Sequence, residues 1–266
     1  MKIIVCVKQV PDSEGVKTDP KTGNLIRDGV AAIINPFDMY AIEEAVRLKE
    51  EYGWQVTSLS MGPPASEHSL RYSMALGCDE AVLLSDRSFA GADTLATSYS
   101  LSKGIEKIGE FDIIFVGTKT TDGDTGQVGA GIAEFLGIPV VYYVTEVVEL
   151  KKGHIIVKRL LEDRIQTLKV KTPVVLSVVK GVNRPRLPTM REKIEADKKD
   201  LTIYNAIDVG ADFMQIGLDG SPTKVLKVFP PAKRKKGEIV SGSPKETAKK
   251  LVAFLNEKKL LGDGIC

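Results

Sequence analysis

Residues 111–129 read FDIIFVGTKTTDGDTGQVG. The apolar part, 111–117, predicts a buried strand, and residues 130–136 have the composition of a helix. In a glycine- and threonine-rich loop between the two, backbone N–H groups and the positive end of a helix dipole converge on an anion. The loop is neither a Walker A motif nor a G-x-G-x-x-G fingerprint at the first strand. It predicts a phosphate site, with an ordinary strand-to-helix turn as the alternative.

The chain on either side of this loop alternates between strand and helix patterns. Asn35 and Pro36 are a preferred N-cap and first helical residue, and Gly53 ends the apolar periodicity that follows. Such alternation implies right-handed βαβ crossovers and an α/β fold with a doubly wound, mainly parallel sheet. The expected strands are 2–7, 55–59, 80–84, 113–116 and 138–144, and the expected helices are 36–52, 64–77, 93–108 and 130–136.

The expected topology also predicts where a ligand binds. Ligands of open parallel sheets lie outside the carboxyl ends of the strands. The loops after Val7, Leu59, Leu84 and Val116 should therefore surround one crevice.

The second half of the chain follows a different pattern. The strand-like runs 155–160, 165–171 and 174–179 are joined by short turns and predict an antiparallel extension of the sheet. Periodicity is then lost over 183–243, and Ser243, Pro244 and Glu246 mark the start of a helix with a capping box. This amphipathic helix packs either on a partner or back on its own domain.

Composition excludes several classes of protein. Lys and Arg number 37 against 35 Asp and Glu, so the charge gives no reason to expect nucleic acid. Three cysteines are too few for a disulfide framework, and His68 and His154 have no companions at metal-ligand spacing. Neither a signal peptide nor a membrane-spanning run is apparent, so we expect a cytoplasmic protein without direct membrane insertion and without a metal site.

Five segments in collinear order carry a family resemblance. They are VKQVPD at 7–12, the run from NPFD to AIEEAVRLK at 35–49, GADT at 91–94, DGDTGQV at 122–128 and NRPR at 183–186. Together they resemble the beta subunit of electron transfer flavoproteins. The resemblance implies a fold of the adenine-nucleotide-binding (universal-stress/ETF-like) type, with the antiparallel extension and a C-terminal arm ending in a helix. It also implies an obligate heterodimer with an alpha subunit that carries its own FAD.

The resemblance further divides the chain into three parts. Residues 1–182 would form the nucleotide- or FAD-binding domain, and 183–200 the partner recognition loop with the segment after it. Residues 201–266 would form the C-terminal arm and helix that dock on the alpha subunit.

The family contains two kinds of member, which differ in the nucleotide they hold. Housekeeping members carry an Asp-rich phosphate loop and AMP, whereas bifurcating members carry Asp-Gly-Asp-Thr-x-Gln-Val with Val-Lys-Gln-Val-Pro-Asp and a second FAD. This chain has both of the latter patterns, at 122–128 and 7–12. By resemblance its site holds FAD, NADH reduces that FAD, and electrons pass to the alpha-subunit FAD and to ferredoxin or flavodoxin. Two alternatives stay open: an AMP-holding shuttle that accepts electrons from dehydrogenases, and a stand-alone adenine-nucleotide-binding regulatory protein.

The resemblance and the loop positions together single out a set of cofactor-binding residues. No catalytic acid, base or nucleophile is expected, because a flavin supplies the chemistry itself. Cys6 is alternatively a core side chain, and Asn35 is a helix cap in either case. Asp38 is alternatively a partner of the helix dipole, and Asp93 with Thr94 a cap pair. The set is Cys6, Val7, Lys8, Pro11, Asp12, Asn35, Asp38, Ser60, Met61, Gly62, Asp93, Thr94, Thr97, Gly117, Thr118, Asp122, Gly123, Asp124, Thr125, Gly126, Gln127 and Val128.

A second set of residues aligns with the recognition loop of the family. This loop would insert an apolar anchor into a partner dehydrogenase or quinone oxidoreductase, and Met190 stands where the anchor is usually Leu. Methionine is an adaptable substitute in a docking contact. The docking residues implied are Arg186, Leu187, Pro188, Thr189, Met190 and Arg191.

Overall fold

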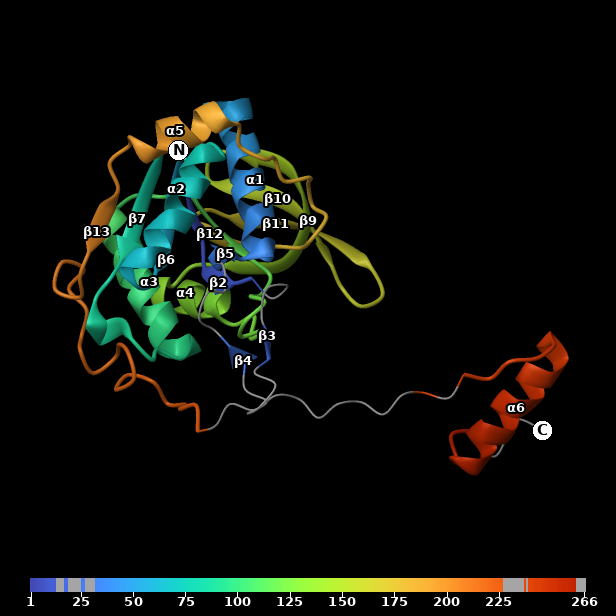
Figure 1. Ribbon diagram of the computed structural model, residues 1–266. Helices are drawn as coiled ribbons and strands as arrows, with labels where there is room; N and C mark the ends of the chain where they lie inside the picture. Colours follow the sequence, from blue (N-terminus) through green and yellow to red (C-terminus); the bar gives the residue numbers. More distant parts are fainter. Residues whose placement is uncertain (13–16, 19–24, 27–31, 227–236, 238, 262–266) are drawn as a thin grey trace. The chain divides into compact units, whose positions relative to one another are not determined.

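The computed structural model describes residues 1–12, 17–18, 25–26, 32–226, 237 and 239–261. The strands of the main sheet are β1 (Lys2–Cys6), β6 (Gln55–Met61), β7 (Glu80–Leu84), β8 (Ile113–Gly117), β9 (Val140–Lys151), β10 (His154–Leu160), β11 (Ile165–Lys171), β12 (Val174–Val178) and β13 (Thr202–Tyr204). Their order across the sheet is β11-β10-β9-β12-β8-β1-β6-β7-β13 (Figure 1). Two small sheets pair β2 (Gln9–Pro11) with β5 (Ala32–Ile34) and β3 (Lys17–Thr18) with β4 (Leu25–Ile26).

The sheet is mainly parallel. Every neighbouring pair from β9 to β13 runs parallel. In β1 and in β8, four of the five residues are buried, which is the pattern of a parallel strand covered on both faces. The predicted α/β fold with a mainly parallel sheet is confirmed.

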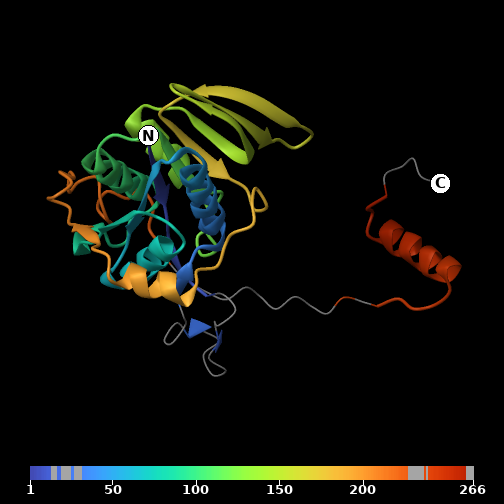
Figure 2. The same ribbon diagram turned by 90° about the horizontal axis from the view of Figure 1, so that it is seen from above.

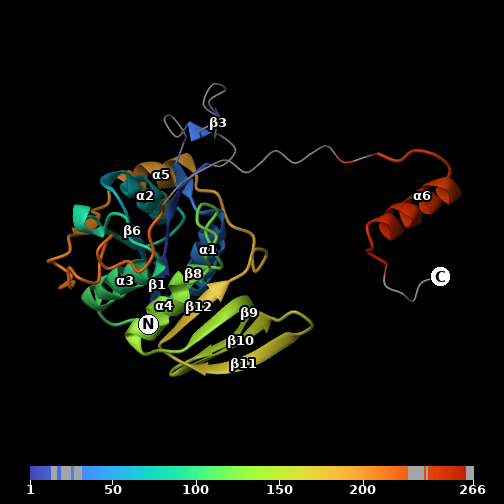
Figure 3. The same ribbon diagram turned by 90° about the horizontal axis from the view of Figure 1, so that it is seen from below.

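Helices cover both faces of this sheet. They are α1 (Pro36–Tyr52), α2 (Glu67–Ala75), α3 (Thr94–Ile108), α4 (Val128–Leu136), α5 (Met190–Asp197) and α6 (Pro244–Glu257), with the 3-10 helices η1 (Pro64–Ser66) and η2 (Arg87–Phe89). Figure 3 shows α1 and α2 on one face and α3 and α4 on the other. Since successive side chains of a strand point to opposite faces, Ile3 and Val5 join one hydrophobic core and Ile4 joins the other.

Local sequence signals set the ends of the first helix. Pro36 is the first residue of α1, and Gly53 ends it in the left-handed conformation, with φ of 71°. Glycine adopts this conformation without a side-chain clash. The predicted boundaries of α1 are therefore confirmed.

The antiparallel extension consists of β9, β10 and β11, which pair antiparallel in that order. Figure 2 shows these strands, in yellow-green to yellow, at one side of the domain. The prediction that residues 174–179 belong to this extension was wrong, because β12 turns back between β8 and β9 and runs parallel to both. All five residues of β12 are buried, as in a central strand. The fifth strand is also longer than predicted, since β9 continues past residue 144 to Lys151.

The segment after residue 183 contains structure that its weak periodicity did not predict. A capping box between Thr189 and Glu192 starts α5, which packs on α2. Residues 202–204 then form β13 at the edge of the sheet, parallel to β7. The prediction of an aperiodic connection was wrong here, although the Thr-x-x-Glu pattern was a readable helix signal.

The chain divides into two compact units, Met1–Val228 and Phe229–Cys266. Residues 201–226, which the resemblance would place in the C-terminal arm, thus fall within the first unit. In the second unit, the predicted capping box between Ser243 and Glu246 is confirmed at the start of α6. Across the described residues, no helix is both long and apolar enough to cross a membrane.

Candidate functional site

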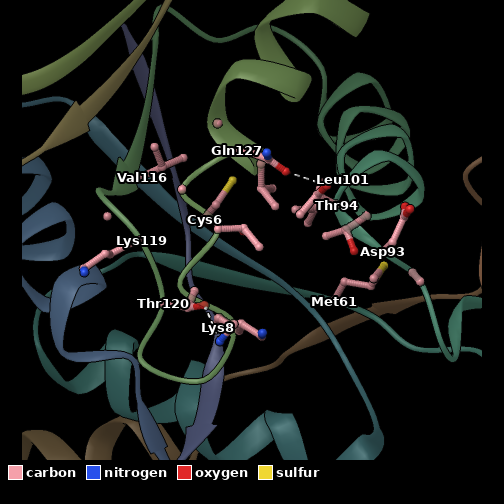
Figure 4. A pocket seen from close by; sticks show the side chains of 18 of the residues that line it. Cys6, Lys8, Met61, Asp93, Thr94, Leu101, Val116, Lys119, Thr120 and Gln127 are labelled. Atoms are coloured by element: carbon pink, nitrogen blue, oxygen red, sulfur yellow. Dashed lines mark hydrogen bonds between the residues drawn. The ribbon is translucent and has the colours of Figure 1, made fainter. Parts of the chain in front are cut away.

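A cavity of about 740 Å³ lies at the carboxyl ends of β1, β6 and β8. This is the place predicted from the topology, and the volume is in the range of small-molecule sites. Figure 4 shows its walls, with Cys6 and Lys8 from the end of β1, Met61 from the end of β6, and Thr94 and Leu101 from α3.

Most of the predicted cofactor residues meet at this cavity. Those that line it are Cys6, Val7, Lys8, Asp38, Met61, Asp93, Thr94, Thr97, Gly117, Thr118, Gly123, Thr125, Gly126, Gln127 and Val128. Those outside its lining are Pro11, Asp12, Asn35, Ser60, Gly62, Asp122 and Asp124. The hydroxyl of Ser60 is buried and has no hydrogen-bond partner within the described part of the chain.

Several lining residues were not singled out in the sequence. Lys119 and Thr120 belong to the phosphate loop itself and could have been added from the motif. Tyr142 and Thr223 come from distant parts of the chain, and no local signal identifies them. The remaining additions are Phe89, Gly91, Ala92, Leu101, Val116, Gly129 and Val225.

The phosphate loop has open backbone N–H donors at its C-terminal end. The N–H groups of Gly123 and Asp124 are used within the loop, in hydrogen bonds to Thr120. Those of Thr125, Gly126 and Gln127 have no hydrogen-bond partner within the described part of the chain, and these residues line the cavity. Backbone donors left open beside a cavity are suited to an anion.

Gly126 is the sterically demanding glycine of the loop. Its φ is +62°, and a Cβ there would lie 3.1 Å from the carbonyl oxygen of Thr118. At Gly123, by contrast, the nearest atom would be at an ordinary 3.6 Å. A side chain would therefore be harder to accommodate at Gly126 than at Gly123.

Two helices start at this cavity. α3 begins at Thr94 and α4 begins at Val128, and Thr94 Oγ1 donates to Gln127 Oε1 at 3.0 Å (Figure 4). The hydroxyl of Tyr142 accepts from the N–H of Ala130 in the first turn of α4. Since the N-terminus of a helix carries partial positive charge, the α4 end favours an anion, whereas the α3 end is already capped by the Asp93 carboxylate.

Two lysines flank the loop, each paired with one of its carboxylates. Lys8 Nζ lies 2.6 Å from Asp122 Oδ2, and Lys119 Nζ lies 2.7 Å from Asp124 Oδ1. Burial alone would raise the pKa of Asp122, but hydrogen bonds from Lys8 and Thr120 bring it below its ordinary value. Asp122 therefore stays ionised and positions Lys8, instead of facing a phosphate.

Asn35 and Asp38 connect the start of α1 to the loop. Asn35 is the N-cap residue of α1, as predicted, but its side chain makes no cap hydrogen bond. Its Nδ2 instead donates to Asp38 Oδ1 and to the carbonyl of Lys119, each at 2.9 Å, and its Oδ1 accepts from the N–H of Thr121 at 3.3 Å. Asn35 thus holds the loop from behind the cavity wall.

Asp38 is a buried carboxyl group in this wall. It accepts from the N–H of Lys8 at 2.8 Å, and a Cβ at Gly117 would collide with it. Burial raises the pKa of Asp38 to about 7, against the lowering effect of its hydrogen bonds. Burial, and then the charge of Asp38, raise the pKa of the Cys6 thiol to about 12, so the thiol is neutral.

Asp93 is the N-cap of α3. Its Oδ1 accepts from the N–H groups of Leu95 and Ala96, at 2.9 and 3.1 Å. Its Oδ2 accepts from the N–H and the hydroxyl of Thr223, at 3.1 and 2.8 Å. The cap interpretation of Asp93 is thus confirmed, and Thr94 supplies the hydroxyl that faces Gln127.

The predicted docking residues separate into two groups. Arg186 is held by Glu43 and Glu50 of α1, at 2.9 Å for its closest contact with Glu43, and Thr189 caps α5. Leu187 and Met190 are 81% and 71% exposed. Leu187 and Met190 are therefore available to a partner, as is Arg191, whose side chain is 87% exposed.

No group of three His, Cys, Asp or Glu side chains within the described residues is arranged to hold a metal ion. Of the three cysteines, Cys6 and Cys78 are buried free thiols, and Cys266 lies outside the described residues.

Comparison with known proteins agrees with this geometry. The family model described as the electron transfer flavoprotein domain matches residues 22–209. The electron transfer flavoprotein subunit beta of Thermoanaerobacterium thermosaccharolyticum is 48% identical, over 98% of this chain and 100% of that protein. The protein of the same name from Clostridium acetobutylicum is 46% identical, over 97% of this chain and 99% of its own. The caffeyl-CoA reductase-Etf complex subunit CarD of Acetobacterium woodii is 44% identical, over 98% of this chain and 100% of that protein.

Proposed function

Because the chain belongs to the electron transfer flavoprotein beta-subunit family, we propose that it binds FAD in the cavity at the ends of β1, β6 and β8. In this proposal the protein is one half of a heterodimer, with an alpha subunit as its partner. It bifurcates the electrons of NADH between the alpha-subunit FAD and ferredoxin or flavodoxin, in the cytoplasm. Its exposed docking residues engage a partner dehydrogenase or quinone oxidoreductase.

The observation that carries the proposal is the start of α4 at the cavity, together with the open N–H groups of the loop before it. α3 and α4 both begin at the cavity and are joined there by the Thr94–Gln127 hydrogen bond. The Asp93 carboxylate already caps α3, so the phosphates of FAD would face the start of α4. The open N–H groups of Thr125, Gly126 and Gln127 add donors on the same side.

The remaining walls suit the ring systems of a dinucleotide. Met61, Phe89 and Leu101 supply apolar contacts, and Val7 and Val116 extend this surface at the strand ends. When bound, FAD supplies the acceptance of a hydride and the release of single electrons. The chain has only to bind and orient it, and it does so with a helix end, backbone donors and apolar side chains.

Two ion pairs beside the cavity balance the charges of its two lysines. Lys8 and Lys119 line the cavity but are paired with Asp122 and Asp124, so their positions are fixed before an anion arrives. A fixed donor loses little conformational entropy on binding, which favours affinity.

One relative supports, by its name, the assembly of the protein with a further redox enzyme. CarD is a subunit of a caffeyl-CoA reductase-Etf complex, so a protein 44% identical to this chain assembles with a reductase. The same-family alternative is a simple shuttle with AMP in this cavity. The different-class alternative, a stand-alone nucleotide-binding regulator, has no use for the exposed Leu187 and Met190.

The test is a count of cofactors. The chain is co-expressed with its alpha subunit, the heterodimer is purified, and the nucleotides released on denaturation are quantified. We expect two FAD and no AMP for each heterodimer. One FAD with one AMP would refute bifurcation and leave the family assignment standing.

A further inference from the structure

A segment from the C-terminal part of the first unit lies at the cavity. Thr223 and Val225 line the cavity together with β1, β8 and α3. They follow Ser221 and precede the end of the first unit at Val228. We call residues 221–226 the strap.

Asp93 holds the strap at the cavity. A carboxylate has about four lone-pair sites, and in Asp93 four protein donors occupy them. Two of these donors are the N–H and the hydroxyl of Thr223, which is 130 residues away in the chain. Asp93 therefore has no acceptor capacity left for a ribose hydroxyl.

The strap is also fixed on its upstream side. Ser221 Oγ accepts from the N–H of Asp93 at 2.8 Å and donates to the carbonyl of Gly217 at 2.6 Å. Leu218 packs closely on Gly91: a Cβ added at Gly91 would lie 3.3 Å from the Cβ of Leu218. These contacts fix the chain just before Thr223, and the hydrogen bonds to Asp93 fix Thr223 itself.

The strap carries apolar side chains that the protein does not cover. Val225 lines the cavity but is 84% exposed, and Leu226 beside it is 95% exposed. An apolar side chain held at a cavity by hydrogen bonds made two residues earlier in the chain, at Thr223, is suited to cover an apolar part of the ligand.

We propose that Asp93 is a positioning residue for the bound nucleotide: it does not touch the ligand but holds Thr223 and Val225 against it and so slows its release. The inference rests on the proposed nucleotide site. It also reassigns Asp93, because the same carboxylate that caps α3 ties the C-terminal part of the domain to the cofactor.

The test compares substitutions that keep the helix cap. We call the two hydrogen bonds from Thr223 to Asp93 the clasp. Serine is a good N-cap but is too short to reach Thr223, so Asp93→Ser removes the clasp and preserves the start of α3. Thr223→Val removes one of the two clasp donors, and Val225→Ser removes the apolar contact. The matched control is Asp86→Ser, because Asp86 caps η2 and accepts from the N–H of Ala206, a similar long-range clasp outside the cavity lining.

The measurement is the release rate of the nucleotide from the purified heterodimer, followed after rapid dilution into nucleotide-free buffer. We expect release to be about tenfold faster in Asp93→Ser and a few-fold faster in Thr223→Val and Val225→Ser, consistent with the loss of one or two hydrogen bonds or one contact. Asp86→Ser should release at the wild-type rate. The melting temperatures of Thr223→Val and Val225→Ser should match the wild type.

A second readout does not depend on the nucleotide. Lys224 lies between Thr223 and Val225 and is exposed. Trypsin should cut after Lys224 faster in Asp93→Ser than in Asp86→Ser, and bound nucleotide should slow this cut in the wild type.

Wild-type release rates in Thr223→Val and Val225→Ser would overturn the positioning role, even if Asp93→Ser did not fold. An equal acceleration in Asp86→Ser would overturn it as well, because the effect would then be general. A wild-type heterodimer with no nucleotide in this site would refute both proposals, whereas a filled site with unchanged release refutes only this one.

Discussion

The side-chain nitrogen of Asn35 lies 2.9 Å from Asp38 Oδ1 and an equal 2.9 Å from the carbonyl oxygen of Lys119. A single amide thus connects a buried carboxyl group at the start of α1 to the backbone of the phosphate loop. Since Asp38 also accepts from the N–H at the end of β1, it fixes three parts of the cavity wall at once. The protonation state of Asp38 should therefore influence both stability and the shape of the site.

We first predict a pH effect on stability from Asp38. Burial raises its pKa from 3.8 to about 7, so between pH 4 and 7 the native state keeps a proton that the unfolded chain has lost. The stabilisation is complete below pH 4 and is lost as the pH rises through 7, at no more than about 1.4 kcal/mol per pH unit. Denaturant unfolding of the wild type and of Asp38→Asn, from pH 4.5 to 7.5, should show a shallower decline in the variant. Parallel profiles would contradict the assigned pKa.

The second prediction concerns Gly126. Gly126→Val places a branched side chain at φ of +62°, beside the carbonyl of Thr118, where an anion must approach the backbone. The heterodimer should lose the nucleotide of this site and keep the alpha-subunit flavin, as measured by chromatography of the released nucleotides. Gly137→Val is the control, because Gly137 has φ of +63° at the end of α4 and a Cβ added there would meet no atom within 4 Å. If Gly126→Val kept full occupancy, the loop would be only a turn.

The third prediction tests the docking anchor. Met190 is 71% exposed at the start of α5, so Met190→Ala should leave the melting temperature nearly unchanged. Loss of a central anchor costs about 2 kcal/mol, so electron delivery to the partner should need roughly 30-fold more partner for half-maximal rate. Met214→Ala is a matched control, since Met214 is 75% exposed and outside the predicted docking set. Equal kinetic effects in the two variants would argue against a specific anchor.

The fourth prediction separates structure from docking in the same segment. Arg186 pairs with Glu43, whose side chain is only 8% exposed, and with Glu50. Arg186→Gln leaves the Glu43 carboxylate without its charged partner and should cost about 1–3 kcal/mol of unfolding free energy, reduced by the partial exposure of Arg186. Arg191→Gln breaks only the exposed pair with Glu195 and should leave stability nearly unchanged. Similar losses in the two variants, by denaturant unfolding, would show that the Glu43 contact is weak.

Local patterns were sufficient to predict much of this fold. Pro36 and Gly53 define α1, and the apolar run before the phosphate loop is β8. Both signals act within a few residues, where propensity and capping decide the structure. The phosphate loop and most of its neighbours at the cavity follow from the same reasoning, because parallel strand ends meet at one edge of a sheet.

What the sequence did not predict depends on contacts between distant residues. No local pattern near Thr223 indicates that Asp93, 130 residues earlier, accepts its hydrogen bonds. Nor does the run of β12 indicate by itself which neighbours it pairs with. The helix α5 is a different case, because its Thr189–Glu192 capping box was present in the sequence and was outweighed by the surrounding prolines.

The place of β12 has a consequence for how the chain assembles. β8 and β9 are both synthesised before β12. They join the same sheet only when β12, Val174–Val178, pairs with both of them. A chain growing on the ribosome therefore exposes the open edge of β8 until residue 178 has been synthesised. An apolar edge left open is a site for wrong pairing, and closing a sheet through distant residues is slow. The middle of the domain is thus completed after its antiparallel margin, and the interval between the two is when a nascent chain is most exposed to aggregation.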